Sequence, residues 1–384
     1  MEYLKYLQSL EKFGIHLGLD RINFLLQKLG NPQFKFKSIH VAGTNGKGST
    51  CAMMASILKE AGYKVGLYTS PHLFDYAERI KINGKDISKK KISEGIRRVR
   101  KAAEGMREKP TIFETLTAVA FWFFAKEKVD YAVVEVGMGG RLDATNVITP
   151  LVSVITNIDY EHTEVLGKSL SRIAREKTGI IKPGVPVVTT ETKAEPIRVM
   201  KAVAEKNGSV LIAVSGKLSA VSSNLIGTHQ KLNAACAVAA LRLAGIKVSK
   251  TAIATGLQKV QWPARFQVIS RKPLTIIDGA HNPAGIEVLT KSLKSLFPGK
   301  RFSFVIGVQK DKNARAMLSR LKPLAKKIII TCSSHQRAAK TVAGKRAVKL
   351  KKALGLTEKE DRVIAGSLYL AAEVLRELKD LKFT

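Results

Sequence analysis

The stretch His40-Val41-Ala42-Gly43-Thr44-Asn45-Gly46-Lys47-Gly48-Ser49-Thr50 decides the fold of the first half of the chain. Before it, the apolar run 36–41 predicts a β-strand that ends at Ala42-Gly43. After it, residues 49–61 place apolar side chains on one face of a helix, and Gly62 predicts where that helix ends. A strand, a glycine-rich loop and a helix therefore follow one another, which is typical of phosphate-binding folds.

The loop carries the residue types that hold the phosphates of a nucleotide. Glycines let backbone N–H groups turn toward an anion, the start of the helix adds partial positive charge, and Lys47 can reach the terminal phosphates. Ser49 or Thr50 can offer a hydroxyl to Mg²⁺. Two residues separate Gly43 from Gly46, whereas general nucleotide hydrolases have about four there. The spacing departs from that pattern but leaves the phosphate chemistry intact, so the loop predicts binding of ATP or a close relative.

A carboxylate stands near the end of a second apolar strand. The run 129–136 predicts a buried strand that contains Glu135, and an acid there is costly unless it is paired or bound to a metal. At the carboxyl edge of a parallel sheet, near a phosphate loop, Mg²⁺ is the natural partner. The glycine-rich stretch 137–141 comes next, but Leu142 takes the place of the third glycine, so it fails as a dinucleotide fingerprint.

Short apolar runs alternate with helical periods along the chain, which predicts an α/β fold of βαβ units around a parallel sheet. A second alternating block begins near residue 266, and we expect the domain boundary around Trp262-Pro263. In the first block the expected strands include 64–69, 151–156 and 185–189, with helices at 111–123 and 230–244. In the second block strands are expected at 274–277, 302–306 and 327–331, and helices at 284–296, 314–321 and 367–378.

The composition is that of an ordinary globular protein with an unusual charge. Of the 384 residues 45% are hydrophobic, and the three cysteines lie too far apart for a disulfide framework or a structural zinc site. Neither a signal peptide nor a membrane-spanning run is evident, so a cytoplasmic protein without membrane contact is expected. The 65 basic and 31 acidic residues give a net charge of +34, which favours anionic partners. Aromatic residues do not interleave the basic ones, so nucleic acid is expected to bind only non-specifically, if at all.

Motifs along the whole chain resemble, in order, those of folylpolyglutamate synthase/dihydrofolate synthase, the folate branch of the Mur ligases. Besides the loop 40–50, the resemblance rests on these segments: Phe13-Gly14-Ile15, Leu17-Gly18-Leu19-Asp20-Arg21-Ile22, Thr69-Ser70-Pro71-His72-Leu73, Glu78-Arg79-Ile80, Phe113-Glu114, 135–146, Ile158-Asp159 to His162, 176–184, His229-Gln230 with Asn233-Ala234-Ala235, Trp262-Pro263-Ala264-Arg265-Phe266, Asp278-Gly279-Ala280-His281-Asn282-Pro283 and Gly366-Ser367-Leu368-Tyr369.

The resemblance implies a P-loop ATPase domain of the Mur-ligase type with a parallel sheet and the folate site over residues 1–264. It implies a smaller Rossmann-like α/β ligase domain, on the glutamate side, over residues 265–384. The implied reaction is ATP-dependent amide formation: a carboxylate of folate or dihydropteroate takes the γ-phosphate of ATP, and the amine of L-glutamate then displaces phosphate and leaves ADP. A monomer is expected.

The resemblance also implies a role for particular residues, which fall into three groups. The ATP site would comprise Gly43, Thr44, Asn45, Gly46, Lys47, Gly48, Ser49, Thr50, Asn233 at the adenine, Arg265 and Asp278. The catalytic set would comprise Lys47, Lys177, Arg265, Asp278 and His281, of which the last two face the acyl phosphate and the incoming amine. Two Mg²⁺ sites would draw on Ser49, Ser70, Glu135, His162 and Lys177.

Several alternatives stay open on the sequence alone. Lys177 can be carbamylated, which would make it a carboxylate-like metal ligand, or can be an unmodified lysine paired with Glu176 or a phosphate. Glu114 can be no more than the partner of Thr111 in a capping box, and His162 a solvated side chain. Dihydropteroate, reduced folates or both can be the substrate. A cell-wall Mur ligase would need a further N-terminal domain, and a nucleic-acid-stimulated ATPase would need a basic and aromatic face.

Overall fold

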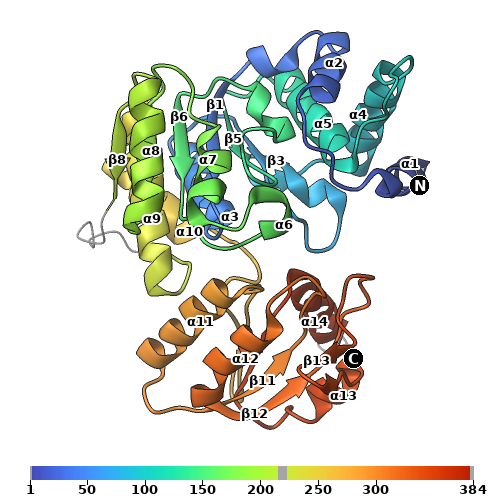
Figure 1. Cartoon of the computed structure of the whole chain (residues 1–384), viewed down its shortest axis with the longest axis vertical. Helices are drawn as coiled ribbons and strands as arrows, with labels where there is room; N and C mark the ends of the chain where they lie inside the picture. Colours follow the sequence, from blue (N-terminus) through green and yellow to red (C-terminus); the bar gives the residue numbers. More distant parts are fainter. Residues whose placement is uncertain (1, 215–222, 381–384) are drawn as a thin grey trace. The chain divides into compact units, whose positions relative to one another are not determined.

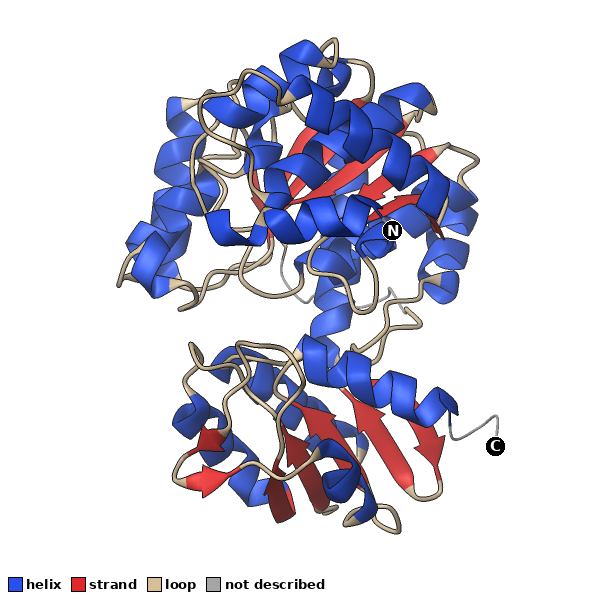
Figure 2. Cartoon of the chain, turned by 90° about the vertical axis from the view of Figure 1, so that its right-hand side faces the viewer, coloured by secondary structure: helices blue, strands red, loops and turns tan. Residues whose placement is uncertain are grey.

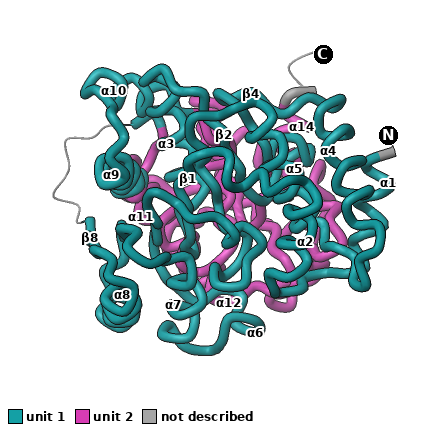
Figure 3. Tube along the Cα trace, turned by 90° about the horizontal axis from the view of Figure 1, so that it is seen from above, with its two compact units in different colours: residues 1–224, 230–260 teal, residues 225–229, 261–384 magenta. Residues whose placement is uncertain are grey.

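A computed structural model of the chain describes residues 2–214 and 223–380. The chain divides into two compact units (Figure 3). Unit 1 consists of residues 1–224 and 230–260, and unit 2 consists of residues 225–229 and 261–384. Helix α9 (Thr228–Leu243) therefore starts in unit 2 and continues in unit 1.

Unit 1 is built on an eight-stranded sheet in the order β4-β3-β2-β5-β1-β6-β7-β8. From β2 to β8 all pairs are parallel, as predicted, whereas β3 and β4 add an antiparallel edge that was not predicted. Val41 lies opposite Glu135 and Ala42 lies opposite Ile155, so the phosphate loop leaves the sheet between the ends of β5 and β6. The strands are β1 (Lys37–Ala42), β2 (Val65–Tyr68), β3 (Ile80–Ile82), β4 (Lys85–Asp86), β5 (Tyr131–Glu135), β6 (Val152–Ile155), β7 (Val187–Thr189) and β8 (Leu211–Ala213).

Helices lie on both sides of this sheet, with α3, α9 and α10 on one side of β1 and α7 and α8 on the other (Figures 1 and 3). Helix α3 packs tightly on α10: a Cβ on Gly256 would lie 2.5 Å from the Ile57 backbone, and the Ser56 hydroxyl donates to the Gly256 carbonyl at 2.7 Å. The α-helices of unit 1 besides α9 are α1 (Glu2–Ser9), α2 (Asp20–Lys28), α3 (Lys47–Glu60), α4 (Lys89–Ala102), α5 (Ile112–Lys126), α6 (Thr163–Leu166), α7 (Leu170–Thr178), α8 (Ala194–Lys206) and α10 (Lys250–Lys259).

Unit 2 is a smaller five-stranded α/β unit with the strand order β12-β11-β15-β10-β9, flanked by helices (Figure 2). Strand β9 pairs antiparallel at one edge, and the other strands are parallel. The central strand β15 was not predicted, because it is four residues long and opens with the charged Arg362. The elements are β9 (Gln267–Arg271), β10 (Leu274–Ile277), α11 (Pro283–Leu296), β11 (Phe302–Ile306), α12 (Ala314–Leu321), β12 (Ala325–Ile330), β13 (Thr341–Val342), β14 (Lys345–Arg346), α13 (Leu350–Gly355), β15 (Arg362–Ala365) and α14 (Leu368–Asp380).

The α/β class predicted from the alternation of strands and helices is confirmed in both units. Single 3-10 turns also connect elements, and one of them, η1 (Glu11–Phe13), leads from α1 toward α2. None of the helices within the described residues combines the length and apolar character needed to cross a membrane.

Candidate active site

The phosphate loop is held open by two glycines in conformations that other residues rarely adopt. Gly43 has a φ of 145°, and a Cβ there would lie 1.8 Å from the Thr156 hydroxyl oxygen. Gly46 has a φ of 85° and caps α3. The backbone N–H of Thr44 donates to the Asn157 carbonyl at 2.7 Å, so the segment after β6 anchors the loop. The chain therefore has to be glycine at these turns, and the first turn of α3 begins directly behind them.

Two lysine amines converge on one carbonyl of this loop. The Lys47 Nζ donates to the Gly43 carbonyl at 3.1 Å and to the Thr44 carbonyl at 3.2 Å. The Lys177 Nζ, near the end of α7, donates to the same Gly43 carbonyl at 2.8 Å. Lys177 is 4% exposed, so its amine is buried beside the loop. The structure thus brings two lysine amines to the same carbonyl of the phosphate loop.

The electrostatic surroundings of Lys177 favour the neutral amine. Burial, followed by the nearby charge of Lys47, lowers the pKa of Lys177 from 10.5 to about 7, while Glu161 and Asp143 act in the opposite direction. Asp143 is itself buried, and burial raises its pKa against the hydrogen bonds that it accepts from Met138 and Thr145. A pKa of about 7 leaves a sizeable fraction of Lys177 neutral near neutral pH. The neutral amine is the form that reacts with carbon dioxide.

Glu135 ends β5 next to the loop that follows β2. It is 4% exposed, and its Oε2 accepts a hydrogen bond from the Ser70 backbone N–H at 3.0 Å. Glu135 also contributes to raising the pKa of Cys51, which burial raises first, and Lys47 acts on the same thiol in the opposite sense. Glu135 and Lys47 therefore share one neighbourhood at the sheet edge. A carboxylate and serine hydroxyls are oxygen donors, which suit Mg²⁺ when phosphates supply the remaining ligands.

A polar chain of side chains connects α3 to α9. The Gln230 amide donates to the Ser49 hydroxyl at 3.4 Å, and the Asn233 amide donates to the Gln230 side chain at 2.9 Å. A Cβ on Gly46 would lie 2.8 Å from Asn233 Oδ1, so Asn233 packs directly on the loop. The family resemblance implies a role for Asn233 but none for Gln230. The signal was its place three residues before Asn233, because side chains with this spacing share a helix face.

Other residues of the predicted loop set are occupied by the fold. The Thr44 hydroxyl accepts from the Asp159 N–H at 3.0 Å, and the Asn45 N–H donates to the Asn157 side chain at 2.8 Å. The Thr50 hydroxyl donates to the Gly46 carbonyl at 3.0 Å, within its own helix. Of the two hydroxyl residues Ser49 and Thr50, Ser49 is therefore the one that contacts α9, whereas Thr50 bonds within its own helix.

His162 is the remaining residue that the resemblance assigned to a metal site of unit 1. It is exposed, has a φ of 51° and precedes α6 at the N-cap. Among the described residues no group of three or more His, Cys, Asp and Glu side chains could hold a metal ion. Any metal at this edge would therefore have to draw on hydroxyls, on modified groups or on the nucleotide itself.

Glu114 forms the predicted capping box and a further ion pair. The Thr111 hydroxyl accepts from the Glu114 N–H at 3.2 Å, and Glu114 Oε2 accepts from the Thr111 N–H at 2.7 Å. Glu114 Oε1 also accepts from the Arg21 guanidinium at 3.0 Å. The side chain is 2% exposed, so this buried pair joins α5 to α2. The predicted capping box is therefore present, but Glu114 is more than a capping partner, because it also pairs with Arg21, which local sequence could not reveal.

Unit 2 holds the remaining predicted residues around the end of β10. Asp278 accepts backbone N–H groups from Phe266 at 2.7 Å and from Ala280 at 2.7 Å, one on each carboxylate oxygen. The Arg265 guanidinium donates to the Ala264 carbonyl at 3.2 Å and lies where a Cβ on Gly279 would come within 2.3 Å of it. His281 Nδ1 lies 2.9 Å from the Gly279 carbonyl.

His229, to which the sequence assigned no role, belongs to the same neighbourhood. Burial lowers its pKa, the charge of Arg265 acts in the same sense, and the charge of Asp278 opposes both. The structure thus gathers Arg265, Asp278, Gly279 and His229 in unit 2, and Lys47, Lys177, Glu135 and Ser49 at the sheet edge of unit 1.

Comparison with known proteins agrees with this division. Residues 41–186 match the Mur ligase middle domain, and residues 264–376 match the Mur ligase glutamate ligase domain. The dihydrofolate synthase/folylpolyglutamate synthase of Bacillus subtilis is 38% identical over 360 residues, which cover 85% of this chain and 84% of the relative. The folylpolyglutamate synthase of Lacticaseibacillus casei is 35% identical, covering 98% of this chain and 97% of the relative.

Solved structures give the same result. E. coli FolC in complex with DHPP and ADP superposes with a TM-score of 0.91 at 32% identity, covering 100% of this chain and 98% of that chain. An FPGS-AMPPCP-folate complex superposes with a TM-score of 0.87 at 34% identity, covering 98% of each chain. The chain therefore belongs to the folylpolyglutamate synthase/dihydrofolate synthase family of the Mur ligases.

Proposed function

We propose that this protein is an ATP-dependent ligase that joins L-glutamate to a carboxylate of dihydropteroate, of a reduced folate or of both. The observation that carries the proposal is the convergence of the Lys47 and Lys177 amines on the Gly43 carbonyl, beside Glu135 and at the start of α3. This arrangement suits transfer of a terminal phosphate, because the Lys47 cation and the oriented N–H groups of the loop stabilise the charge that develops on the moving phosphoryl group. Lys177 lies beside them with a lowered pKa, which makes its amine available for carbamylation. The names of the relatives supply the folate-type acid as the acceptor.

The chemistry divides into two steps that conserve atoms and charge. In the first, a carboxylate oxygen of the folate-type acid forms a bond to the γ-phosphorus, and the bond from that phosphorus to the bridging oxygen of ADP breaks. In the second, the amine of L-glutamate forms a bond to the carbonyl carbon, phosphate leaves with its electron pair, and the nitrogen loses a proton. Lys47 would exchange its two loop carbonyls for phosphate oxygens as the nucleotide binds.

Magnesium fits the donors at the sheet edge of unit 1. Ser49, Ser70 and Glu135 would hold one ion, and a carbamylated Lys177 with His162 would hold the second. When bound, Mg²⁺ neutralises phosphate charge. The lowered pKa of Lys177 supports the carbamate, because only the neutral amine adds carbon dioxide. The exposed position of His162 makes it the weakest member of this set.

The unit 2 residues would act on the acyl phosphate and the incoming amine. Asp278 is fixed by two backbone N–H groups, so it can orient a neighbouring group without moving itself. Arg265 would contact phosphate and His281 would face the amine, while Asn233 of unit 1 would hold the adenine. Each of these roles rests on family membership.

The experiment is an assay of ADP release with dihydropteroate and with tetrahydrofolate, each with and without L-glutamate. We expect release that needs both the folate-type acid and glutamate, and the comparison of the two acids defines the substrate. With the acid labelled with ¹⁸O in its carboxylate, the label should appear in the released phosphate. Release that is independent of both acids, or phosphate without label, would overturn the proposal.

A further inference from the structure

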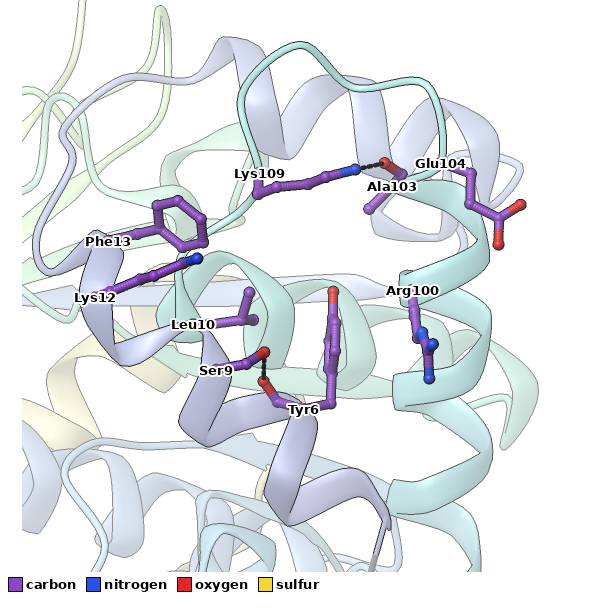
Figure 4. Close-up of a pocket in the computed structure, with 9 residues that line it drawn as sticks. All are labelled: Tyr6, Ser9, Leu10, Lys12, Phe13, Arg100, Ala103, Glu104 and Lys109. Carbon is purple, nitrogen blue, oxygen red and sulfur yellow. Dashed lines mark hydrogen bonds between the residues drawn. The ribbon is translucent and has the colours of Figure 1, made fainter.

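A pocket of about 370 Å³ lies in unit 1 (Figure 4). The residues that line it do not belong to the phosphate loop or to the segments that contact it in the descriptions above. The walls of the pocket come from α1, from η1, from the end of α4 and from the loop before α5. Tyr6, Leu10 and Phe13 give it an apolar and aromatic lining, and Lys12, Arg100 and Lys109 bring basic groups to its rim. A volume of this size is in the range of small-molecule sites, about 300–1,000 Å³.

Each of the two aromatic rings of this pocket has a cationic side chain close to its face. The Lys12 Nζ lies 5.2 Å from the centre of the Phe13 ring, and the Arg100 guanidinium carbon lies 5.8 Å from the centre of the Tyr6 ring. The Lys109 amine reaches across the pocket and donates to the Ala103 carbonyl at 3.3 Å (Figure 4). The pocket therefore sets basic side chains directly beside the faces of its aromatic rings.

Charge and hydrogen bonding at the pocket favour an acid. Glu104 is the one carboxylate among the lining residues, against three basic groups, and its side chain points away from the Tyr6 ring (Figure 4). Burial raises the pKa of Tyr6, and the charge of Arg100 opposes this, so the hydroxyl stays a hydrogen-bond donor at neutral pH. A ligand that combines an aromatic group with carboxylates would contact both the rings and the basic side chains of the lining.

The pocket is joined to the candidate active site by a short segment of chain. Phe13 lies in the pocket, and five residues later the Gly18 N–H donates to the Leu142 carbonyl at 3.3 Å, in the loop that follows Glu135. Between them, the His16 carbonyl accepts from Arg21, which pairs with the buried Glu114. A ligand that fixes Phe13 therefore acts on a segment whose other end touches the loop after β5.

We propose that this pocket is an accessory binding site for an aromatic oligocarboxylate, of the class of an aryl amide that carries a γ-linked oligoglutamate tail. The rings of Tyr6 and Phe13 stack on the aryl group, and Lys12, Arg100 and Lys109 receive the carboxylates. The choice of this class rests on the proposed function, since such molecules are the kind of product that the reaction makes. The requirement for an aromatic group together with several carboxylates rests on the pocket alone.

The test measures binding of p-aminobenzoyl-tri-γ-glutamate by equilibrium dialysis, without ATP. The variant is Lys12→Glu with Arg100→Glu, and its matched control is Lys5→Glu with Lys101→Glu, which makes the same charge change at residues of α1 and α4 outside the lining. We expect the variant to lose one binding equivalent or to bind at that site about tenfold more weakly or worse, and the control to bind as wild type. Tyr6→Leu should weaken binding of the same probe more than Tyr6→Phe does, because phenylalanine keeps the ring and loses only the hydroxyl donor.

Three further arms decide the ligand class. Tri-γ-glutamate without the aryl group and p-aminobenzoate without the tail should each bind far more weakly than the full probe. Equal binding of the aryl-free peptide, displacement of the probe from this site by ADP, or equal affinity in the variant and its control would each overturn the proposal.

ADP release in the same variants separates this proposal from the proposed function. If the variant still releases ADP with folate-type acid and glutamate but loses the probe, both proposals stand. If wild type releases no ADP yet the variant alone loses the probe, the accessory site stands and the proposed function fails. If release is normal and all proteins bind the probe equally, only the accessory site fails.

Discussion

Both units place a carboxylate where a parallel strand ends, but they hold it differently. In unit 1, Glu135 at the end of β5 accepts the Ser70 N–H on one oxygen, and two lysine amines lie at the adjoining loop. In unit 2, Asp278 after β10 accepts a backbone N–H on each oxygen. The carboxyl edge of a parallel sheet supplies the location in both cases, while the neighbours decide the chemistry.

The difference indicates a division of labour between the two edges. At the unit 1 edge the Lys47 and Lys177 amines bond to loop carbonyls, and under the proposed function phosphate oxygens would replace those of Lys47. The unit 2 edge is organised around Asp278, whose hydrogen bonds join the turn after β10 to the segment that contains Phe266. Substitutions at the first edge should therefore change activity more than stability, and substitutions at the second should change both.

The largest expected effect is that of Lys47→Ala. Removing a cation aimed at the transferred phosphate should lower the rate of ADP release by about 10²–10³-fold, with little change in the melting temperature. Lys59→Ala, at the exposed end of the same helix, is the control and should behave as wild type. A rate within about twofold of wild type for Lys47→Ala would contradict the assignment of the amine to the phosphates.

Lys177→Ala tests whether Lys177 acts as a carbamate or as an unmodified cation. We expect a loss of about 10²-fold in ADP release, and partial recovery on adding formate or acetate if a carbamate is the working group. Recovery with methylamine and not with acids would show that an unmodified cation acts instead. Lys168→Ala, at an exposed residue ahead of α7, should leave the rate unchanged.

Glu135→Gln should separate activity from stability at the unit 1 edge. The amide oxygen can still accept the Ser70 N–H, so the free energy of unfolding should change by less than about 1 kcal/mol. The concentration of Mg²⁺ needed for half-maximal ADP release should rise by about tenfold or more, because a charged ligand is lost. An unchanged Mg²⁺ requirement would argue against Glu135 as a metal ligand.

Asp278→Asn, at the unit 2 edge, should lower both the free energy of unfolding and the rate of ADP release. An amide can accept only one of the two N–H groups, from Phe266 or from Ala280, so urea unfolding should show a loss of about 1–3 kcal/mol. ADP release should fall by about tenfold as the turn loses its fixed geometry. Glu358→Gln, at an exposed residue of unit 2, is the control. Full stability of Asp278→Asn would remove the contrast between the two edges.

The smallest effect is a pH dependence of stability that belongs to Lys177. Its pKa of about 7 lies below the ordinary value of 10.5, so the unfolded chain binds more protons between those values and stability rises with pH across that window. Lys177→Met removes this term. Its advantage over wild type in the free energy of unfolding should therefore shrink by about 1–3 kcal/mol between about pH 6.5 and about pH 9.5. A difference that stays constant with pH would show that the pKa is not lowered.

Local sequence patterns predicted the frame of both units because hydrophobic periodicity and turn residues are local signals. Strands β10 and β11 have the predicted bounds, and α3 begins two residues earlier than predicted because Gly46 passes directly into it. The antiparallel edge strands β3, β4 and β9 and the strand β15 were missed, since they are two to five residues long and carry charged or polar residues that interrupt the apolar pattern.

Individual residues of the site were predictable from the sequence, but the contacts between distant segments were not. The spacing around Lys47 and the acid in an apolar strand pointed to the phosphate edge, because each is a local departure from an apolar pattern. The meeting of Lys177 with Gly43, 134 residues away, and of Gln230 with Ser49, 181 residues away, depends on the packing of whole elements. No local pattern contains that information, and only the family resemblance brought Lys177 into the set.

The edges of the two sheets also bear on how copies of this protein meet. Strand β4, at one end of the unit 1 sheet, is two residues long and exposed, and β12, at one end of the unit 2 sheet, carries Lys326 and Lys327. Short or lysine-bearing margins offer a poor template for another chain to extend the sheet. Part of the large positive charge thus disfavours edge-to-edge pairing of strands between molecules at high concentration.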